Sequence, residues 1–433
     1  MTLVDQINLL DLDLFERGEP HAAFRVLRQQ APVHWNQGTD ELKGFWSLLK
    51  YDDIKYVSSH PMLFSSAKGI NGPGLRDPEN NPNAINQPGG ISIITMDPPR
   101  HVKIRRLVNR GFTPKAVNAM EPTIREIARS LLDRIADRDA CDFVLEIASQ
   151  LPLAVICGLM GIPEHDWPLM FQLTNQTLGA ADPEYQAEVM PEDQRGTITA
   201  STRTGLDGRL KMTAYFADLL RERRTNGLRE DLVSTLLESE VDGERLDEVD
   251  ILAFCFLLVL AGNETTRNAI SGGLLALCEH PAERARLQAD VPGLIDTAVE
   301  EILRWTSPLH HMSRRATQDT AIRDQPIRRG DAVLMWYPSA NRDEDVFPEP
   351  YRFDVGRSPN DHVAFGFHEH FCLGAGFARK EIRVLFEELF ARYPNIQLAG
   401  PPARLRSNFI NGIKRLPVTL RQSSVAEDLL LGR

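Results

Sequence analysis

Residues 365–374 read Phe-Gly-Phe-His-Glu-His-Phe-Cys-Leu-Gly, and this stretch decides the interpretation of the whole chain. The residues after it mix apolar and charged side chains at helical spacing, which predicts an amphipathic helix over residues 373–393. Cys372 therefore lies close to a helix N-terminus, where free backbone N–H groups and the helix dipole favour a thiolate. Gly374 and Gly376 leave room for a flat ligand to approach the backbone. A thiolate placed in this way can bind iron.

A lone cysteine is more often a buried structural residue, so its companions matter. Glu301 and Arg304 lie upstream, three residues apart, and can pair on one face of a helix. The same spacing recurs elsewhere, for example at Glu283 and Arg286, so the pair alone carries little weight.

A second upstream signal interrupts the apolar run of residues 251–260. The run continues as Ala-Gly-Asn-Glu-Thr-Thr at residues 261–266, and a helix this apolar must be buried. Polar groups such as Glu264 and Thr265 in its middle cost free energy unless they have a partner or a task. The alternative is a helix kink at Gly262 with a threonine bonded to its own turn.

The cysteine stretch resembles the haem-binding loop of the cytochrome P450 superfamily. The match consists of Phe-Gly seven and six residues before Cys372, a histidine two before it and Leu-Gly after it. The resemblance implies that the Cys372 thiolate is the axial ligand of a haem b iron. The family usually has glycine where this chain has His368, which is a departure from the pattern.

The same resemblance assigns roles to residues throughout the chain. Glu264 and Thr265 would relay protons for the activation of O2, which fits general acid–base logic. Glu301, Arg304 and Arg352 would form a buried structural triad. The haem would be contacted by His101, Arg105, Arg314, Phe365, Gly366, His370 and Gly374. The substrate pocket would be lined by Leu260, Ala261, Leu309, His310, His311, Phe409, Ile410 and Asn411, with the two histidines either bonding an oxygenated ligand or pointing into solvent.

The length of 433 residues would by itself favour two domains. The resemblance instead implies one cytochrome P450 domain over residues 1–433, mostly α-helical with a small β-rich lobe. Hydrophobic residues make up 42% of the chain, enough for a large core.

Cysteine usage and hydropathy predict a cytoplasmic protein without a membrane anchor. The four cysteines other than Cys372 have no metal-site spacing, and an odd total of five disfavours a disulfide framework. The N-terminus lacks the basic and apolar regions of a signal peptide. The apolar run of residues 251–262 is too short to cross a bilayer.

The charge distribution predicts a protein partner. The net charge is −11, yet residues 100–115 contain six Lys or Arg residues and no acid. A basic patch on an acidic protein favours an acidic partner. By the resemblance this partner would be a ferredoxin, which would deliver electrons from NAD(P)H through a ferredoxin reductase. A solvated helix face is the alternative. Nucleic acid is not an expected partner, and the chain is expected to be a monomer.

These observations predict a haem-thiolate monooxygenase that hydroxylates a hydrophobic small molecule with O2. The local sequences at residues 261–270 and 407–414 are similar to those of bacterial family members that oxidise sterol side chains and methyl-branched lipids. Terpenoids are a further possible class of substrate. The alternatives are an oxidase of a specialised metabolite, a peroxide-driven haem peroxygenase, a haem-carrying binding protein, and a non-haem metal site built from His368, His370 and Cys372.

Overall fold

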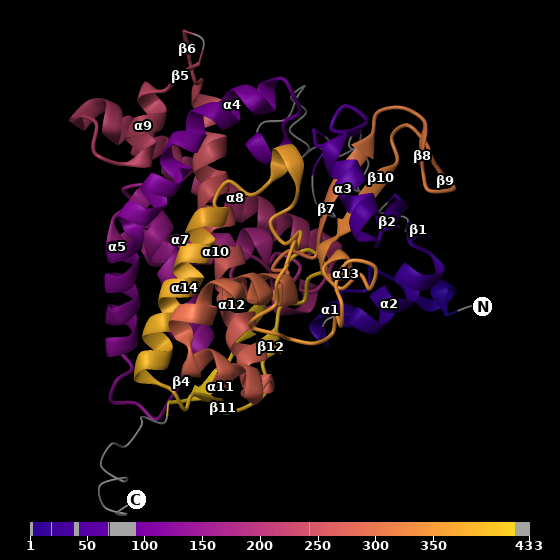
Figure 1. The fold of residues 1–433 in the computed structure, drawn as a ribbon. Coiled ribbons are helices and arrows are strands. Elements are labelled where there is room, and N and C mark those ends of the chain that lie inside the picture. The colour runs from indigo at the N-terminus through magenta and orange to yellow at the C-terminus, as the bar shows by residue number, and fades with distance from the viewer. Residues whose placement is uncertain are drawn as a thin grey trace, which may run out of the picture.

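A computed structural model of the chain describes residues 3–18, 20–38, 43–67, 69, 92–241 and 243–420. A helical body forms one side and a smaller strand-rich lobe the other (Figure 1). The predicted mostly α-helical fold with a small β-rich lobe is confirmed. The α-helices are α1 (Leu12–Glu16), α2 (His21–Gln30), α3 (Tyr51–Ser59), α4 (Arg100–Val108), α5 (Pro114–Asp133), α6 (Gln150–Leu159), α7 (Trp167–Leu178), α8 (Ile198–Asn226), α9 (Leu232–Glu238), α10 (Glu248–Glu279), α11 (Pro281–Ala289), α12 (Val291–Thr306), α13 (Tyr337–Ala340) and α14 (Ala375–Arg392).

The strand-rich lobe is built on a five-stranded sheet in the order β1 (Val33–Asn36), β2 (Phe45–Leu48), β10 (Ala332–Trp336), β7 (His311–Ala316) and β3 (Phe64–Ser65). Only β2 and β10 run parallel in this sheet. Every residue of β10 is buried, which explains its continuous apolar sequence at the sheet centre. The smaller ladders are β4 (Ala140–Asp142) with β14 (Pro417–Thr419) and β11 (Gln397–Leu398), β5 (Glu240–Val241) with β6 (Glu244–Arg245), β8 (Thr320–Ile322) with β9 (Gln325–Ile327), and β12 (Ala403–Arg404) with β13 (Ile413–Arg415).

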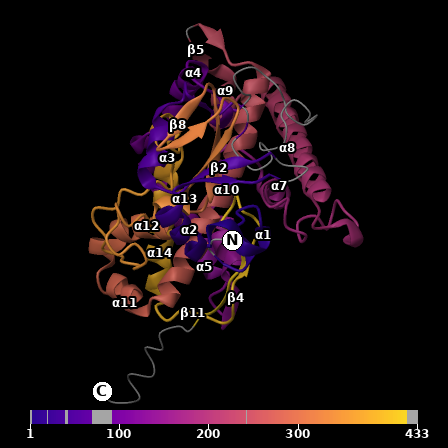
Figure 2. The same cartoon turned by 90° about the vertical axis from the view of Figure 1, so that its right-hand side faces the viewer.

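Helix α10 is the central element of the helical body. It packs against α6, α7, α8, α12 and α14, and Figure 2 shows α7 and α8 together on one side of it. Asp247 caps its N-terminus by accepting a hydrogen bond from the Asp250 N–H at 2.7 Å. The helix continues through the polar residues that follow the apolar run, and at 32 residues it is long and apolar enough to cross a membrane. The expectation of too short a segment was therefore wrong. Half of its most apolar window is buried inside the fold, and this burial accounts for its composition.

Helix α14 begins three residues after Cys372 and confirms the predicted amphipathic helix. It packs against α5, α10 and α12, so its apolar stripe faces the core. Its opposite face joins α5 through ion pairs, in which Arg125 and Arg129 each approach Glu388 to 2.9 Å. The helix therefore fixes the C-terminal end of the cysteine loop against the helical body.

Candidate active site

One large cavity lies between the cysteine loop and α10. Its volume is about 210 Å³, and its walls come from α6, α10 and α14, from the connection between α12 and β7, and from the cysteine loop. The structure therefore gathers most of the predicted site around one space. The predicted residues that line it are His101, Arg105, Ala261, Thr265, Leu309, Arg314, Phe365, Gly366, His370, Cys372 and Gly374.

The Cys372 side chain is exposed to this cavity although it lies deep inside the fold. The loop holds it there because the Cys372 N–H donates to the Phe365 carbonyl at 2.9 Å. Burial raises the pKa of the Cys372 thiol, while the backbone N–H of Gly374 and the charge of Arg105 oppose that rise. A bound metal cation would shift the balance to the thiolate, so the position suits an iron ligand.

The loop adopts left-handed backbone conformations at two positions. Gly366 has φ 72°, which glycine adopts freely, and His368 has φ 62°. A left-handed conformation costs a residue with a Cβ about 1–2 kcal/mol. The structure thus explains the usual glycine at the position of His368: the loop needs this conformation, and here a histidine adopts it at a cost.

A group of nitrogen donors lies together at one side of the cavity. The rings of His101 and His370 are 4.3 Å apart, and the Arg105 guanidinium donates to the Phe371 carbonyl at 2.7 Å. Burial, followed by the charge of Arg105, lowers the pKa of His101 to about 4. Burial, followed by the charge of Arg314, lowers the pKa of His370 to about 2. The group is therefore rich in cations and donors, and the carboxylate whose charge acts on His101 and Arg314 is that of Asp97, which accepts hydrogen bonds from Ser65 and Ser66.

These residues fit a haem. Both ring nitrogens of His101 are buried and have no hydrogen-bond partner in the described part of the chain, so they are available to an anion such as a haem propionate. A Cβ built on Gly374 would meet no atom within 4 Å, which leaves a flat space beside the cysteine. Gly376 plays no such part, because its Cβ would meet Val117 at 3.2 Å, in the packing between α14 and α5.

Thr265 and Glu264 point in different directions from α10. Thr265 lines the cavity, and its hydroxyl donates to the Ala261 carbonyl at 2.7 Å. Glu264 is buried away from the cavity and forms an ion pair with Arg267, which also donates to Asn175 of α7 at 2.9 Å. The part of α10 that carries the Glu264–Arg267 pair packs against α7, and the Glu264 side chain does not line the cavity. The predicted relay pair is thus not assembled at the cavity.

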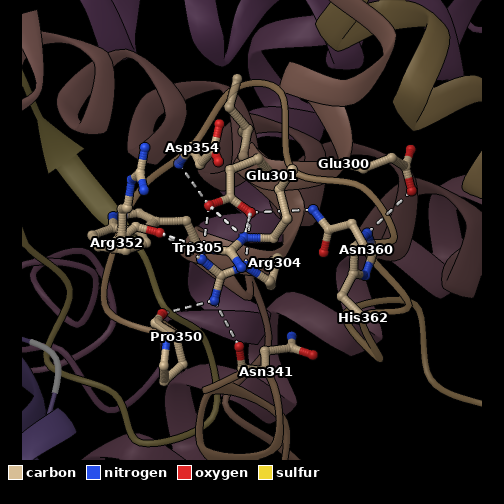
Figure 3. A network of polar contacts seen from close by, with 12 residues as sticks. Glu300, Glu301, Arg304, Trp305, Asn341, Pro350, Arg352, Asp354, Asn360 and His362 are labelled. Carbon is tan, nitrogen blue, oxygen red and sulfur yellow. Dashed lines mark hydrogen bonds and ion pairs between the residues drawn. The ribbon is translucent and has the colours of Figure 1, made fainter. Parts of the chain in front are cut away.

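The buried charge cluster differs from the predicted triad in one member. Glu301 accepts two hydrogen bonds from Arg304, at 2.7 and 2.8 Å, and both side chains are fully buried (Figure 3). The third cation is Arg357, at 3.2 Å from Glu301, and not Arg352. The side chain of Arg352 is 55% exposed and pairs with Glu349, and only its carbonyl accepts from Arg304. The assignment of Arg352 was wrong. Arg352 and Arg357 lie five residues apart in a segment without regular structure, and the sequence does not show which of them reaches Glu301.

Several predicted pocket residues lie outside the cavity lining. The ring of His310 packs against Phe15 and that of His311 against Trp336, each at 4.8 Å, so neither points into solvent or toward the cavity. The other predicted pocket residues that do not line the cavity are held by the core or by neighbouring backbone. Leu260 lies in the apolar cluster around α10, and Phe409 packs on His311. Ile410 forms a β-bridge with Leu309, and Asn411 donates to the Thr306 carbonyl.

Other residues line the cavity without having been predicted. Thr266 and Tyr337 contribute polar groups, and Glu381 of α14 contributes a carboxyl group. Glu381 had a signal in the sequence, because it lies four residues after Phe377 and four before Leu385 on the apolar stripe of the predicted helix. A charged residue on a buried stripe indicates either a partner or a function.

The proposed non-haem metal site is not formed. His368 is exposed, whereas His370 bonds Ser66 at 3.2 Å and faces the cavity with Cys372. Over the described ranges of the chain, no group of three His, Cys, Asp or Glu side chains is placed to hold a metal ion.

Comparison with known proteins agrees with this geometry. The family model for cytochrome P450 matches residues 67–398. A methyl-branched lipid omega-hydroxylase of Mycobacterium tuberculosis is 43% identical over 96% of this chain and 94% of its own length. A steroid C26-monooxygenase of Rhodococcus jostii is 35% identical over 98% of this chain and 86% of its own.

Solved structures give the same result. A Mycobacterium marinum cytochrome P450 in complex with pseudoionone superimposes with a TM-score of 0.84 at 34% identity, covering 96% of this chain and 98% of that one. A Bacillus megaterium cytochrome P450 in complex with testosterone superimposes with a TM-score of 0.81 at 30% identity, covering 95% and 99%. Cys372 lies just before α14, and Thr265 lines the same cavity. The chain therefore belongs to the cytochrome P450 family of haem monooxygenases.

Proposed function

We propose that this monooxygenase hydroxylates the terminal carbon of a methyl-branched lipid or of a sterol side chain. The observation that carries the proposal is the apolar lining of the cavity, which includes Ile93, Phe254, Leu257, Leu309 and Met312. Apolar walls with few polar groups suit a hydrophobic ligand. The names of the relatives, a methyl-branched lipid hydroxylase and a steroid C26-monooxygenase, support the same class of substrate.

Each type of group in the cavity has one function in this proposal. Cys372 would hold the haem iron, and the donors His101, Arg105, Arg314 and His370 would hold the haem carboxylates. The bound haem supplies the activation of O2, with the thiolate favouring O–O cleavage. The Thr265 hydroxyl donates its proton to the Ala261 carbonyl, so on the cavity side its oxygen can accept a hydrogen bond.

Electron delivery is proposed to come from a ferredoxin, reduced by a ferredoxin reductase and ultimately by NAD(P)H. In the basic stretch of residues 100–115, Arg106, Arg110 and Lys115 are exposed. Arg105 is turned inward and Arg100 pairs with Asp250, so the docking charge is smaller than the sequence predicts. Three exposed cations in this stretch still favour an acidic partner. The protein would act in the cytoplasm as a monomer.

The test is a titration of purified ferric protein with methyl-branched lipids, sterols, linear fatty acids and terpenes, followed in the Soret band. A saturable low-spin to high-spin shift with the first two classes, and a terminally hydroxylated product identified by mass spectrometry with ferredoxin and reductase, would support the proposal. A shift only with linear acids or terpenes would contradict the substrate class. Turnover with peroxide and none with the ferredoxin system would contradict the monooxygenase cycle.

A further inference from the structure

A second cavity lies apart from the active site. Its volume is about 280 Å³, and it shares no lining residue with the cavity beside the cysteine loop. Ligand pockets in proteins begin at about 300 Å³, so the space suits a small ligand. Helix α10 is a wall of both cavities: Asn268, Gly272 and Ala276 line the second one, whereas Thr265 and Ala269 line the first. An occupant of the second cavity is therefore separated from the active site by this helix.

Two arginines line the second cavity. Arg342 is buried and already engaged, because its guanidinium donates to the Trp305 carbonyl at 2.8 Å and lies 4.7 Å from the centre of the Trp305 ring. Arg404 of β12 is half-buried, and within the described ranges its side chain forms no hydrogen bond and no ion pair. Of the carboxyl groups in the described part of the chain, the lining includes Glu279 alone, which is exposed. Arg404 is therefore a cation of the cavity that is available to an anion.

The side chain of His21 shows the sign of the charge in this cavity. It lines the same space, and burial lowers its pKa well below the ordinary value. The further causes are the charges of basic neighbours: Arg342, His310, Arg28 and Arg404. Arg28 is balanced by its ion pair with Glu344 at 3.1 Å, and burial lowers the pKa of His310 so far that its ring is uncharged. The two arginines of the lining thus dominate, and a cavity with such walls favours an anion.

The remaining walls are largely apolar. Leu275 and Ile413 are buried side chains that line the space, and Trp305 contributes an aromatic ring. An inorganic ion such as phosphate would leave this apolar surface in contact with water. A cation together with apolar walls therefore fits a small organic acid, which has a carboxylate at one end and a ring or short chain at the other.

We propose that the second cavity binds a small organic carboxylate, with the acid group on Arg404 and the apolar body against Leu275 and Ile413. The guanidinium presents its N–H donors in a fork that matches a carboxylate. This ligand binds on the other side of α10 from Thr265, so it is not the compound that is hydroxylated. The site is independent of which substrate the enzyme oxidises.

The first test is a calorimetric titration of the ferric holoprotein with benzoate. Imidazole is held on the haem iron throughout, so that the active-site cavity is occupied. Saturable binding of benzoate is expected, with the Soret band unchanged. Benzyl alcohol has the same ring without the charge, and inorganic phosphate has the charge without the ring; each is expected to bind about 10-fold or more weakly. Absence of saturable benzoate binding, a shifted Soret band, or equal affinity for either of the other two compounds would overturn the inference.

The second test compares two arginines of one chain segment. Arg404→Ser is expected to weaken benzoate binding about 10-fold or more, because the charge-assisted hydrogen bonds are lost. The matched control is Arg406→Ser. Arg406 does not line the cavity and pairs with Asp13 at 2.6 Å, so its replacement is expected to leave the affinity unchanged. Equal losses in the two variants, or no loss in Arg404→Ser, would contradict the assignment.

A third variant decides the outcome if Arg404→Ser does not fold. Glu279→Gln removes the exposed carboxylate from the lining and is expected to strengthen benzoate binding about 2- to 5-fold. Added salt is expected to reduce this gain, because the charge is screened. An affinity that does not rise in Glu279→Gln would show that charge does not govern the site and would sink the proposal.

Discussion

Glu264 and Arg267 form an ion pair within a single helix, and the two side chains are 1% and 2% exposed. Removing one partner of a buried pair leaves an uncompensated charge, which costs about 3–5 kcal/mol. Arg267→Gln is therefore expected to lower the free energy of unfolding by about 3 kcal/mol. The measurement is urea denaturation of the holoprotein.

The matched control for this pair is the double variant Glu264→Gln/Arg267→Gln, which removes both charges. It is expected to recover most of the loss, because two neutral amides leave no buried charge. Additive losses in the double variant would show that the two side chains do not depend on each other.

The corrected charge cluster gives a second prediction. Arg357→Ala is expected to destabilise the protein by about 3 kcal/mol, since the fully buried Glu301 loses a charge partner. Arg352→Ala is expected to cost under about 1 kcal/mol, because its exposed guanidinium pairs only with Glu349. Denaturation midpoints of the two variants would decide between them, and equal losses would restore Arg352 to the cluster.

The left-handed residue of the cysteine loop gives a third prediction. His368→Gly is expected to raise the free energy of unfolding by about 0.5–1 kcal/mol, because relief of the left-handed conformation exceeds the added freedom of the unfolded chain. Glu369→Gly, at the next residue, has no such conformation to relieve and is expected to destabilise. Thermal denaturation of both would test this, and a loss of stability in His368→Gly would contradict it.

His311 gives a prediction about pH. Burial lowers its pKa to about 3, and the residue is completely enclosed. As the pH falls below 6.5, His311 becomes protonated in the unfolded chain, whereas in the folded chain it stays neutral down to about pH 3. The free energy of unfolding therefore falls over this interval. At pH 5 the loss from this one group is about 2 kcal/mol. His311→Phe is expected to lose less stability than the wild type between pH 7.5 and 5, as measured by urea denaturation at both values; parallel losses would show that His311 is protonated in the folded state.

Thr265 gives a prediction about how tightly electron consumption is coupled to product formation. Thr265→Ala removes the hydroxyl that faces the cavity and is expected to divert several-fold more electrons to hydrogen peroxide at the expense of product. Peroxide release and product formation would be measured per NAD(P)H consumed. Thr266→Ala is the neighbouring control, expected to change this ratio less because its side chain is more buried. Unchanged coupling in Thr265→Ala would remove the residue from the proton path.

The features that the sequence predicted well are carried by local motifs with fixed spacing. The cysteine loop, the helix after it and the donors His101, Arg105, Arg314 and His370 all lie where expected, because each motif specifies its own backbone conformation. The fold class followed from the same motifs through resemblance.

The features that the sequence predicted wrongly depend on the rotation of elements in space. Glu264 adjoins Thr265 in sequence but lies on another face of α10, and only the packing of α7 and α10 determines which face meets the cavity. Arg352 and Arg357 are equivalent by spacing, and the path of an irregular segment decides which one reaches Glu301. Paired histidines at 310 and 311 fit a pocket by position, yet an aromatic cluster holds them elsewhere.

The packing of α14 constrains how the gene can change. An insertion or deletion of one residue near the start of the helix would turn the remaining turns by about 100° and carry its apolar stripe out of the core. The pairs of Glu388 with α5 would be lost in the same step. In this segment a change in the number of residues is therefore expected to be far more damaging than a substitution at one of the exposed positions.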